Sequence, residues 1–116
     1  MRIRTDSGEL LQGTLAILIL KALLAGPAHG FGIARWIERT TEDVLRIEEG
    51  SLYPALRRVE DKGWVTSEWG LSENNRRARY YTLTRQGRAH LRAEAELWLR
   101  YSTAVTRVLA AEPALA

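Results

Sequence analysis

The sequence predicts a mainly helical α+β fold: a small domain over residues 1–84, followed by a long helix within residues 85–116. Residues 50–63 place apolar side chains at helical spacing. Two alternating segments, 64–69 and 79–83, flank a polar stretch that suits a hairpin turn. Residues 85–111 carry an apolar heptad repeat. We therefore expect a helical body, a β-hairpin and a long final helix.

The composition restricts the class of protein. A chain of 116 residues has room for one modest core, and 46% hydrophobic with 27% charged residues is typical of a globular protein. It has no cysteine, which excludes disulfides and thiolate chemistry. The apolar stretch 10–24 is shorter than the roughly 20 residues that a spanning helix needs. No signal-peptide cleavage pattern follows it. We expect a cytoplasmic protein that does not contact membranes.

The positive charge is concentrated in the middle of the chain. The formal net charge is only +3, but residues 46–92 hold ten basic and six acidic side chains. A local basic patch is typical of proteins with a polyanionic partner. An ordinary solvated surface rich in arginine is the alternative, and charge alone does not decide between the two.

The first helix is expected to begin at a Thr14 cap and to end near Ala25. It is apolar nearly all round, so it must be buried on most sides. In so small a domain this pattern suggests that a second chain covers part of it, with Leu15 and Leu18 at the contact.

A second helix is expected over residues 30–40, after the break at Gly26-Pro27. Ile33, Trp36 and Ile37 share the face that it would bury.

The third helix is expected to begin at Gly50 or Ser51 and to stop at Gly63. Pro54 limits the start, because proline is tolerated in the first helical turn and is costly beyond it. Its apolar arc comprises Leu52, Ala55, Leu56 and Val59. Its opposite arc comprises Tyr53, Pro54, Arg57, Arg58 and Asp61.

The hairpin that follows is expected to have a long basic turn over residues 70–78, with Asn74-Asn75 as the turn signal. A helix followed by a basic hairpin is the layout of a winged helix-turn-helix DNA-binding domain. The sequence alone therefore nominates eight DNA-binding residues: Ser51, Tyr53, Pro54, Arg57, Arg58, Arg76, Arg77 and Arg79.

Each type of residue in this set suits a DNA contact. One α-helix fits the major groove, where Arg57 or Arg58 could bind phosphate or guanine. Ser51 could donate to a phosphate or a base edge, and Tyr53 could contact a thymine methyl or a phosphate. The alternatives are that Tyr53 is half-packed and that the arginines are simply solvated. Asp61 would repel phosphate and marks where contact should end.

The last helix is expected to begin at a Thr84 cap and to run close to 40 Å, at roughly 1.5 Å per residue. Its heptad seam comprises Leu91, Ala95, Trp98, Ser102, Val105 and Leu109. A domain of this size cannot cover such a helix alone, so we expect it to form a homodimer. The alternative is that the helix packs on its own domain.

Nothing in the sequence indicates catalysis. His29 and His90 are far apart and neither has metal-ligand spacing to another ligand. No phosphate-binding loop or nucleophile elbow is present. We expect no catalytic residues, metal or cofactor, and a structural role for His29 at a helix start.

Four short motifs occur in order along the chain: Gln12-Gly13-Thr14-Leu15, His29-Gly30-Phe31-Gly32-Ile33, Gly50-Ser51-Leu52-Tyr53-Pro54-Ala55-Leu56 with Glu60 and Gly63, and Tyr80-Tyr81-Thr82-Leu83-Thr84 with Gly87. In these motifs the chain resembles the PadR family of bacterial transcriptional regulators over roughly residues 9–100. Phe31 stands where the family usually has tyrosine, and Ala78 interrupts the family's basic run before the tyrosines.

The resemblance implies a dimeric repressor that binds double-stranded operator DNA. The single terminal helix is similar to that of the family's small subgroup, in which it pairs with the partner chain. It also implies a small aromatic effector near the dimer interface, lined here by Leu97, Trp98 and Tyr101; an interface anchor is the alternative role of Trp98. The competing hypothesis is a winged-helix module that contacts only proteins.

Overall fold

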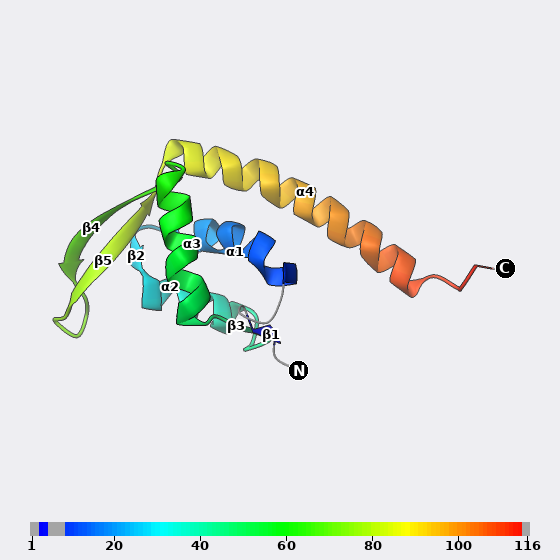
Figure 1. The fold of residues 1–116 in the computed structure, drawn as a ribbon, viewed down its shortest axis with the longest axis horizontal. Helices are drawn as coiled ribbons and strands as arrows, with labels where there is room; N and C mark the ends of the chain where they lie inside the picture. The colour runs from blue at the N-terminus through cyan, green and yellow to red at the C-terminus, as the bar shows by residue number, and fades with distance from the viewer. Residues whose placement is uncertain (1–2, 5–8, 115–116) are drawn as a thin grey trace.

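The computed structural model describes residues 3–4 and 9–114, with side chains from residue 14 onward. It confirms a mostly helical α+β architecture (Figure 1). The elements in chain order are β1 (Ile3–Arg4), α1 (Glu9–Ala22), β2 (Ala28–His29), α2 (Gly30–Thr40), β3 (Leu45–Arg46), α3 (Glu49–Asp61), β4 (Val65–Leu71), β5 (Arg77–Leu83) and α4 (Arg85–Ala110).

Helix α1 lies at the centre of the domain and packs against α2, α3 and α4. The predicted Thr14 cap was wrong: the helix begins at Glu9, ends at Ala22 and includes Thr14 in its interior. The chain itself buries much of the apolar surface of α1; Leu15, for example, is only 2% exposed. Leu18 is partly buried against the same core.

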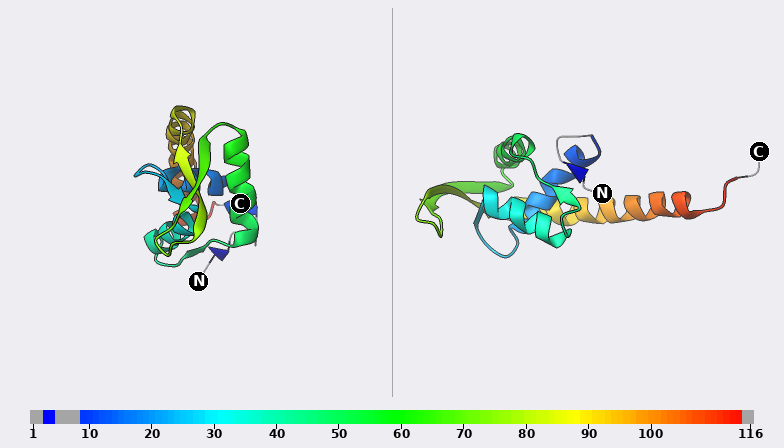
Figure 2. Two further views of the ribbon diagram at one scale, coloured as in Figure 1. Left: turned by 90° about the vertical axis from the view of Figure 1, so that its left-hand side faces the viewer. Right: turned by 90° about the horizontal axis from the view of Figure 1, so that it is seen from below.

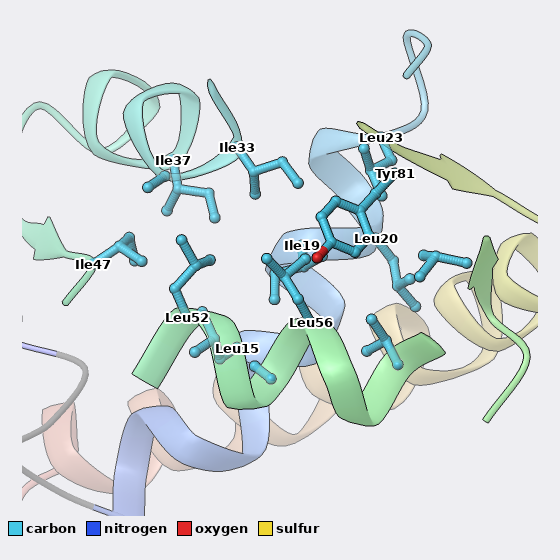
Figure 3. Packing of buried hydrophobic residues seen from close by; sticks show 14 of the residues in the cluster. Leu15, Ile19, Leu20, Leu23, Ile33, Ile37, Ile47, Leu52, Leu56 and Tyr81 are labelled. Atoms are coloured by element: carbon cyan, nitrogen blue, oxygen red, sulfur yellow. The ribbon is translucent and has the colours of Figure 1, made fainter. Parts of the chain in front are cut away.

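Helices α2 and α3 bring their apolar faces onto α1 (Figure 3). The predicted bounds of α2 are confirmed, although Trp36 is only partly buried. His29 caps α2, where its Nδ1 accepts a hydrogen bond of 3.0 Å from Gly32 N. The predicted apolar arc of α3 is confirmed, because all four of its members are buried. Tyr81 points from β5 into the same core (Figure 3).

The hairpin is antiparallel, with a register from Val65 opposite Leu83 to Leu71 opposite Arg77. Each strand extends two residues further toward the tip than predicted, so the turn spans only residues 72–76. Asn75 has the left-handed φ of 57° that suits its turn position. Strand β2 adds to β5, and β1 pairs with β3; neither pairing was predicted, because two-residue strands carry no periodicity.

Helix α4 begins where it was predicted to begin. Thr84 Oγ1 accepts a hydrogen bond of 3.0 Å from Gly87 N and caps it. Leu91 is buried against the domain, and the helix then projects away from it (Figure 2). The molecule measures 62 × 30 × 21 Å in consequence.

Close packing fixes the joint between the domain and α4. Thr84 Oγ1 also donates to Gly63 O over 2.7 Å, and Gly63 ends α3 with a φ of +79°. The predicted stop at Gly63 is thus confirmed. The rings of Trp64 and His90 stack with centroids 3.6 Å apart, at 13° to one another. The start of α4 is therefore tied directly to the end of α3.

Candidate nucleic-acid interface

Two polar side chains at the end of α2, Glu38 and the cap residue Thr41, hold the loop that leads into α3. Glu38 is buried, and its Oε2 accepts a hydrogen bond of 3.0 Å from Ile47 N. Thr41 Oγ1 accepts from Leu45 N over 3.1 Å. A bond to a charged acceptor is stronger than one between neutral groups, so Glu38 fixes the point at which the chain enters α3.

Helix α3 begins at Glu49, one residue before the predicted start. Pro54 is therefore the sixth residue of the helix. It lies beyond the first turn, whereas we expected it within that turn. A proline there has no N–H for the carbonyl of Gly50, and its ring crowds that carbonyl. Gly50 lacks a Cβ, and open space surrounds the position that one would occupy. The missing backbone bond thus falls at the exposed start of the helix.

The polar arc of α3 is open to solvent. Pro54, Arg57, Arg58 and Asp61 are exposed, and Ser51 is partly so. Tyr53 is 49% exposed, because its ring rests on the start of α2. A Cβ added at Gly30 would lie 3.2 Å from Tyr53 Cε1. Tyr53 is therefore half-packed, and it lines a groove together with residues of α2 and the hairpin.

The hairpin forms the wing, and its arginines occupy two different settings. Arg76 is in the turn, whereas Arg77 and Arg79 lie on β5. Both strand arginines stack over the ring of Trp69, with guanidinium carbons 4.6 Å and 5.6 Å from its centroid. Arg79 Nη2 is also 3.7 Å from Glu60 Oε2 on α3. The predicted basic turn is thus mainly a basic strand.

The opposite face of the wing is braced by Tyr80. Its ring covers Gly70, where an added Cβ would be 3.1 Å from Tyr80 Cδ2. Its hydroxyl donates to Leu71 O over 3.0 Å. The ring also meets His29 edge-on, at a centroid distance of 5.3 Å. These contacts stiffen the wing and join it to the start of α2.

Sequence reasoning missed one wall of this surface. A groove of about 1040 Å³ runs between α2 and the wing, and Arg35 and Arg39 of α2 line it together with Phe31 and Trp69. Phe31 is 68% exposed and Trp69 is 56% exposed. The spacing of Arg35 and Arg39, four residues apart on one helix face, was the available signal. Among the described residues, the lining contains five arginines and a single carboxylate, Glu73.

One titratable group lies under the groove. Burial raises the pKa of the Tyr81 hydroxyl, and the nearby Arg79 guanidinium opposes that rise. Tyr81 therefore stays neutral at neutral pH, and the charge of the groove comes from its arginines.

Most of the predicted seam of α4 lies outside the core. Leu91 is buried in its own chain, and Ala95 and Ser102 are partly buried. Trp98, Val105 and Leu109 are exposed. The three residues expected to line an effector pocket are also exposed on α4, and the rings of Trp98 and Tyr101 are 6.2 Å apart.

Two other kinds of site are missing from the described part of the chain. Residues 3–4 and 9–114 contain no group of three or more His, Cys, Asp or Glu side chains that could hold a metal ion. Among the helices described, none is both long enough and apolar enough to cross a bilayer.

A helical body, a hairpin wing and a long final helix define a winged helix-turn-helix protein. Residues 19–93 match the transcriptional regulator PadR-like family, and the chain belongs to that family. It is therefore a transcriptional regulator, of a family that is not enzymatic. PadR regulators bind DNA.

Solved structures agree with this fold. A transcriptional regulator from Clostridium thermocellum matches with a TM-score of 0.78 and 27% identity, over 86% of this chain and 97% of that one. A PadR family transcriptional regulator from Eggerthella lenta matches with a TM-score of 0.73 and 31% identity, over 90% and 88% of the two chains. An uncharacterized 37.1 kDa protein in transposon TN4556 of Streptomyces fradiae is 40% identical over 86 residues, which are 74% of this chain but only 23% of that protein.

Proposed function

We propose that this regulator binds operator DNA as a homodimer through α3 and the wing. One observation carries the proposal: exposed arginines of α2 and the wing line one groove, Tyr53 of α3 lines it with them, and α3 exposes Arg57 and Arg58 to solvent. Helix α3 would enter the major groove, with its first turns toward the base edges. The wing and α2 would contact the flanking phosphates. The protein would then work in the cytoplasm, with the DNA.

The arginines of α3 would have separate roles. Successive residues of a helix are 100° apart, so Arg57 projects on the side of Tyr53 and Arg58 projects away from it. Ser51 and Pro54 lie at the end that enters the groove first. Asp61 lies at the far end of the same exposed arc, where its charge would limit the contact.

A second copy of the chain would cover the exposed side of α4. Trp98, Val105 and Leu109 follow the heptad spacing of a two-helix seam, and they are exposed in a single chain. Leu18 of α1 is only partly buried against the core, so a partner helix could cover the rest of it. Pairing would place two α3 helices about one turn of DNA apart, roughly 34 Å, on a pseudo-palindromic operator.

The regulator would act as a repressor that a small aromatic ligand releases. Trp98, Leu97 and Tyr101 offer a broad apolar surface on α4, close to the proposed seam. A ligand held there between two chains would change the angle between the two domains. Because the joint of Trp64 and His90 ties α4 to the end of α3, such a change would misplace one α3 helix and weaken operator binding.

Binding to the DNA upstream of its own gene, measured over a salt series, tests this proposal. We expect affinity to fall at least about a hundredfold between 50 and 200 mM salt, since each neutralised phosphate releases counterions. A duplex of scrambled sequence serves as the control and should bind more weakly at every salt concentration. A failure to bind either duplex at low salt would favour the module that contacts only proteins.

A further inference from the structure

A chain of hydrogen bonds connects three elements at the base of the wing. Arg79 Nε, on β5, donates to Ser67 Oγ on β4 over 2.8 Å. Ser67 Oγ in turn donates to Glu60 Oε2 on α3 over 2.5 Å. Arg79 Nη2 closes the ring at 3.7 Å from the same carboxylate oxygen. A hydroxyl has one proton to donate, so Ser67 uses it on Glu60 while it accepts from Arg79.

The neighbouring Arg77 has no such restraint. It projects from the same face of β5, two residues nearer the tip, and stacks over the same Trp69 ring. Within the described residues it makes no ion pair with a carboxylate. Two arginines of one strand thus differ in one respect: Arg79 is bound to α3 and Arg77 is not.

We infer that Arg79 is a positioning residue, and that Glu60, Ser67 and Arg79 form a clamp that sets the angle between the wing and α3. Its consequence for affinity rests on the proposed DNA binding. The inference departs from the expectation that every wing arginine contacts phosphate. Arg77 and Arg76 remain to make those contacts.

Charge and geometry support this role. An ion pair between partly exposed groups contributes little stability, so the clamp is better explained by the geometry that it enforces. Glu60 lies on α3, the helix proposed to enter the major groove, where an unpaired carboxylate would repel DNA. Arg79 balances that carboxylate and cannot also be fully available to a phosphate. A wing already held at the bound angle loses less conformational freedom on binding.

The test compares three substitutions of similar size: Glu60→Met, Arg79→Met and, as the matched control, Arg77→Met. If the clamp positions the wing, Glu60→Met should weaken operator binding by about tenfold, and so should Arg79→Met. The double variant should lose no more than either single one, because both remove the same clamp. If Arg79 instead contacts phosphate, Glu60→Met should tighten binding, since it removes a repelling charge.

The salt dependence of binding gives a second readout. Loss of structure alone would not change it in Arg77→Met and leave it unchanged in Arg79→Met. The slope of log affinity against log salt should become shallower by about 0.9 for each phosphate contact that Arg77→Met removes. It should be unchanged in Arg79→Met, because the remaining wing arginines still reach phosphate once the wing is ordered on DNA. A shallower slope in Arg79→Met, equal to that of Arg77→Met, would overturn the inference.

A measurement without DNA separates the clamp from the proposed function. The chain has no cysteine, so a spin label can be attached at the wing turn through Glu73→Cys alone. Its broadening of the amide signals of α3 should change in Glu60→Met and Arg79→Met and stay the same in Arg77→Met. An unchanged pattern in all three would reject the clamp even if DNA binding is confirmed. If the broadening changes as expected but the protein does not bind DNA, the clamp is confirmed and the proposed function is rejected.

Discussion

Helices α3 and α4 are both amphipathic, but the chain itself covers only one of them. The apolar arc of α3, from Leu52 to Val59, is buried on α1. On α4, Leu91 is buried, whereas Trp98, Val105 and Leu109 are exposed. They follow Leu91 on the part of the helix that projects away from the domain (Figure 2). Periodicity therefore identifies which side of a helix is apolar. It does not identify which molecule covers that side.

The largest expected effect comes from charging the open seam of α4. The pair Val105→Asp and Leu109→Asp would place four carboxylates in the proposed dimer interface. Burial of an unpaired charge costs several kcal/mol, so we expect dimerisation to weaken by more than about 4 kcal/mol. Analytical ultracentrifugation should then show a monomer at micromolar concentration. Operator binding should fall with it.

The matched control charges a different side of the same helix, turned about 100° from the seam. Thr103→Asp and Ala110→Asp add the same charge at a seven-residue spacing on exposed positions away from the seam. We expect this variant to stay dimeric. At concentrations where the protein is monomeric, both double variants should have the melting temperature of the wild type, since none of the four positions contacts the core. If the variant with Val105→Asp and Leu109→Asp remains dimeric, a second chain does not cover this side of α4, and the contrast with α3 is wrong.

The joint between the two helices comes next. A Cβ at Gly87 would overlap the backbone carbonyl of Trp64 and approach Leu83 Cδ1 to 2.9 Å. The backbone of Trp64 cannot yield cheaply, so Gly87→Ala should lower the free energy of unfolding by about 3 kcal/mol. Urea denaturation measures this loss. Gly50→Ala, where open space surrounds the added carbon, should change stability by less than about 1 kcal/mol.

Local signals predicted the end of α3 and the start of α4 well. Gly63 and Thr84 act within a few residues of their own positions, so their roles can be read from the sequence. The start of α1 was misread for a related reason. Gly13-Thr14 carries the local signs of a helix start, but packing on three other helices overrides them.

The settings of individual arginines could not be predicted from the sequence. Ser67 and Arg79 are twelve residues apart, and only the hairpin register brings them together beside Glu60. Arg35 and Arg39 look like any solvated helix face until the wing is placed across the groove from them. Residue type suggested a basic interface, but the fold determines which arginines are free to act.

A smaller effect is expected on the open side of α3. Arg57→Ala should weaken operator binding by about 1–3 kcal/mol if the guanidinium reads a base. Fluorescence anisotropy should then show a larger loss on the operator than on scrambled DNA, because a base contact carries specificity and a phosphate contact does not. Arg100→Ala removes the same charge from an exposed site on α4 and should leave both affinities unchanged. Equal operator affinity for Arg57→Ala and wild type would remove Arg57 from the interface.

The smallest effect is expected at Glu38, the buried side chain that holds the loop before α3. Glu38→Gln keeps an oxygen that can accept from Ile47 N but removes its charge, so the bond becomes an ordinary neutral one. We expect a loss of about 1 kcal/mol in the free energy of unfolding. Glu42→Gln, at an exposed position in the following turn, should cost nothing measurable. If Glu38→Gln also leaves the free energy of unfolding unchanged, the loop before α3 is held by Thr41 and packing. The start of α3 would then be determined by residues near it in the sequence, as its end is by Gly63.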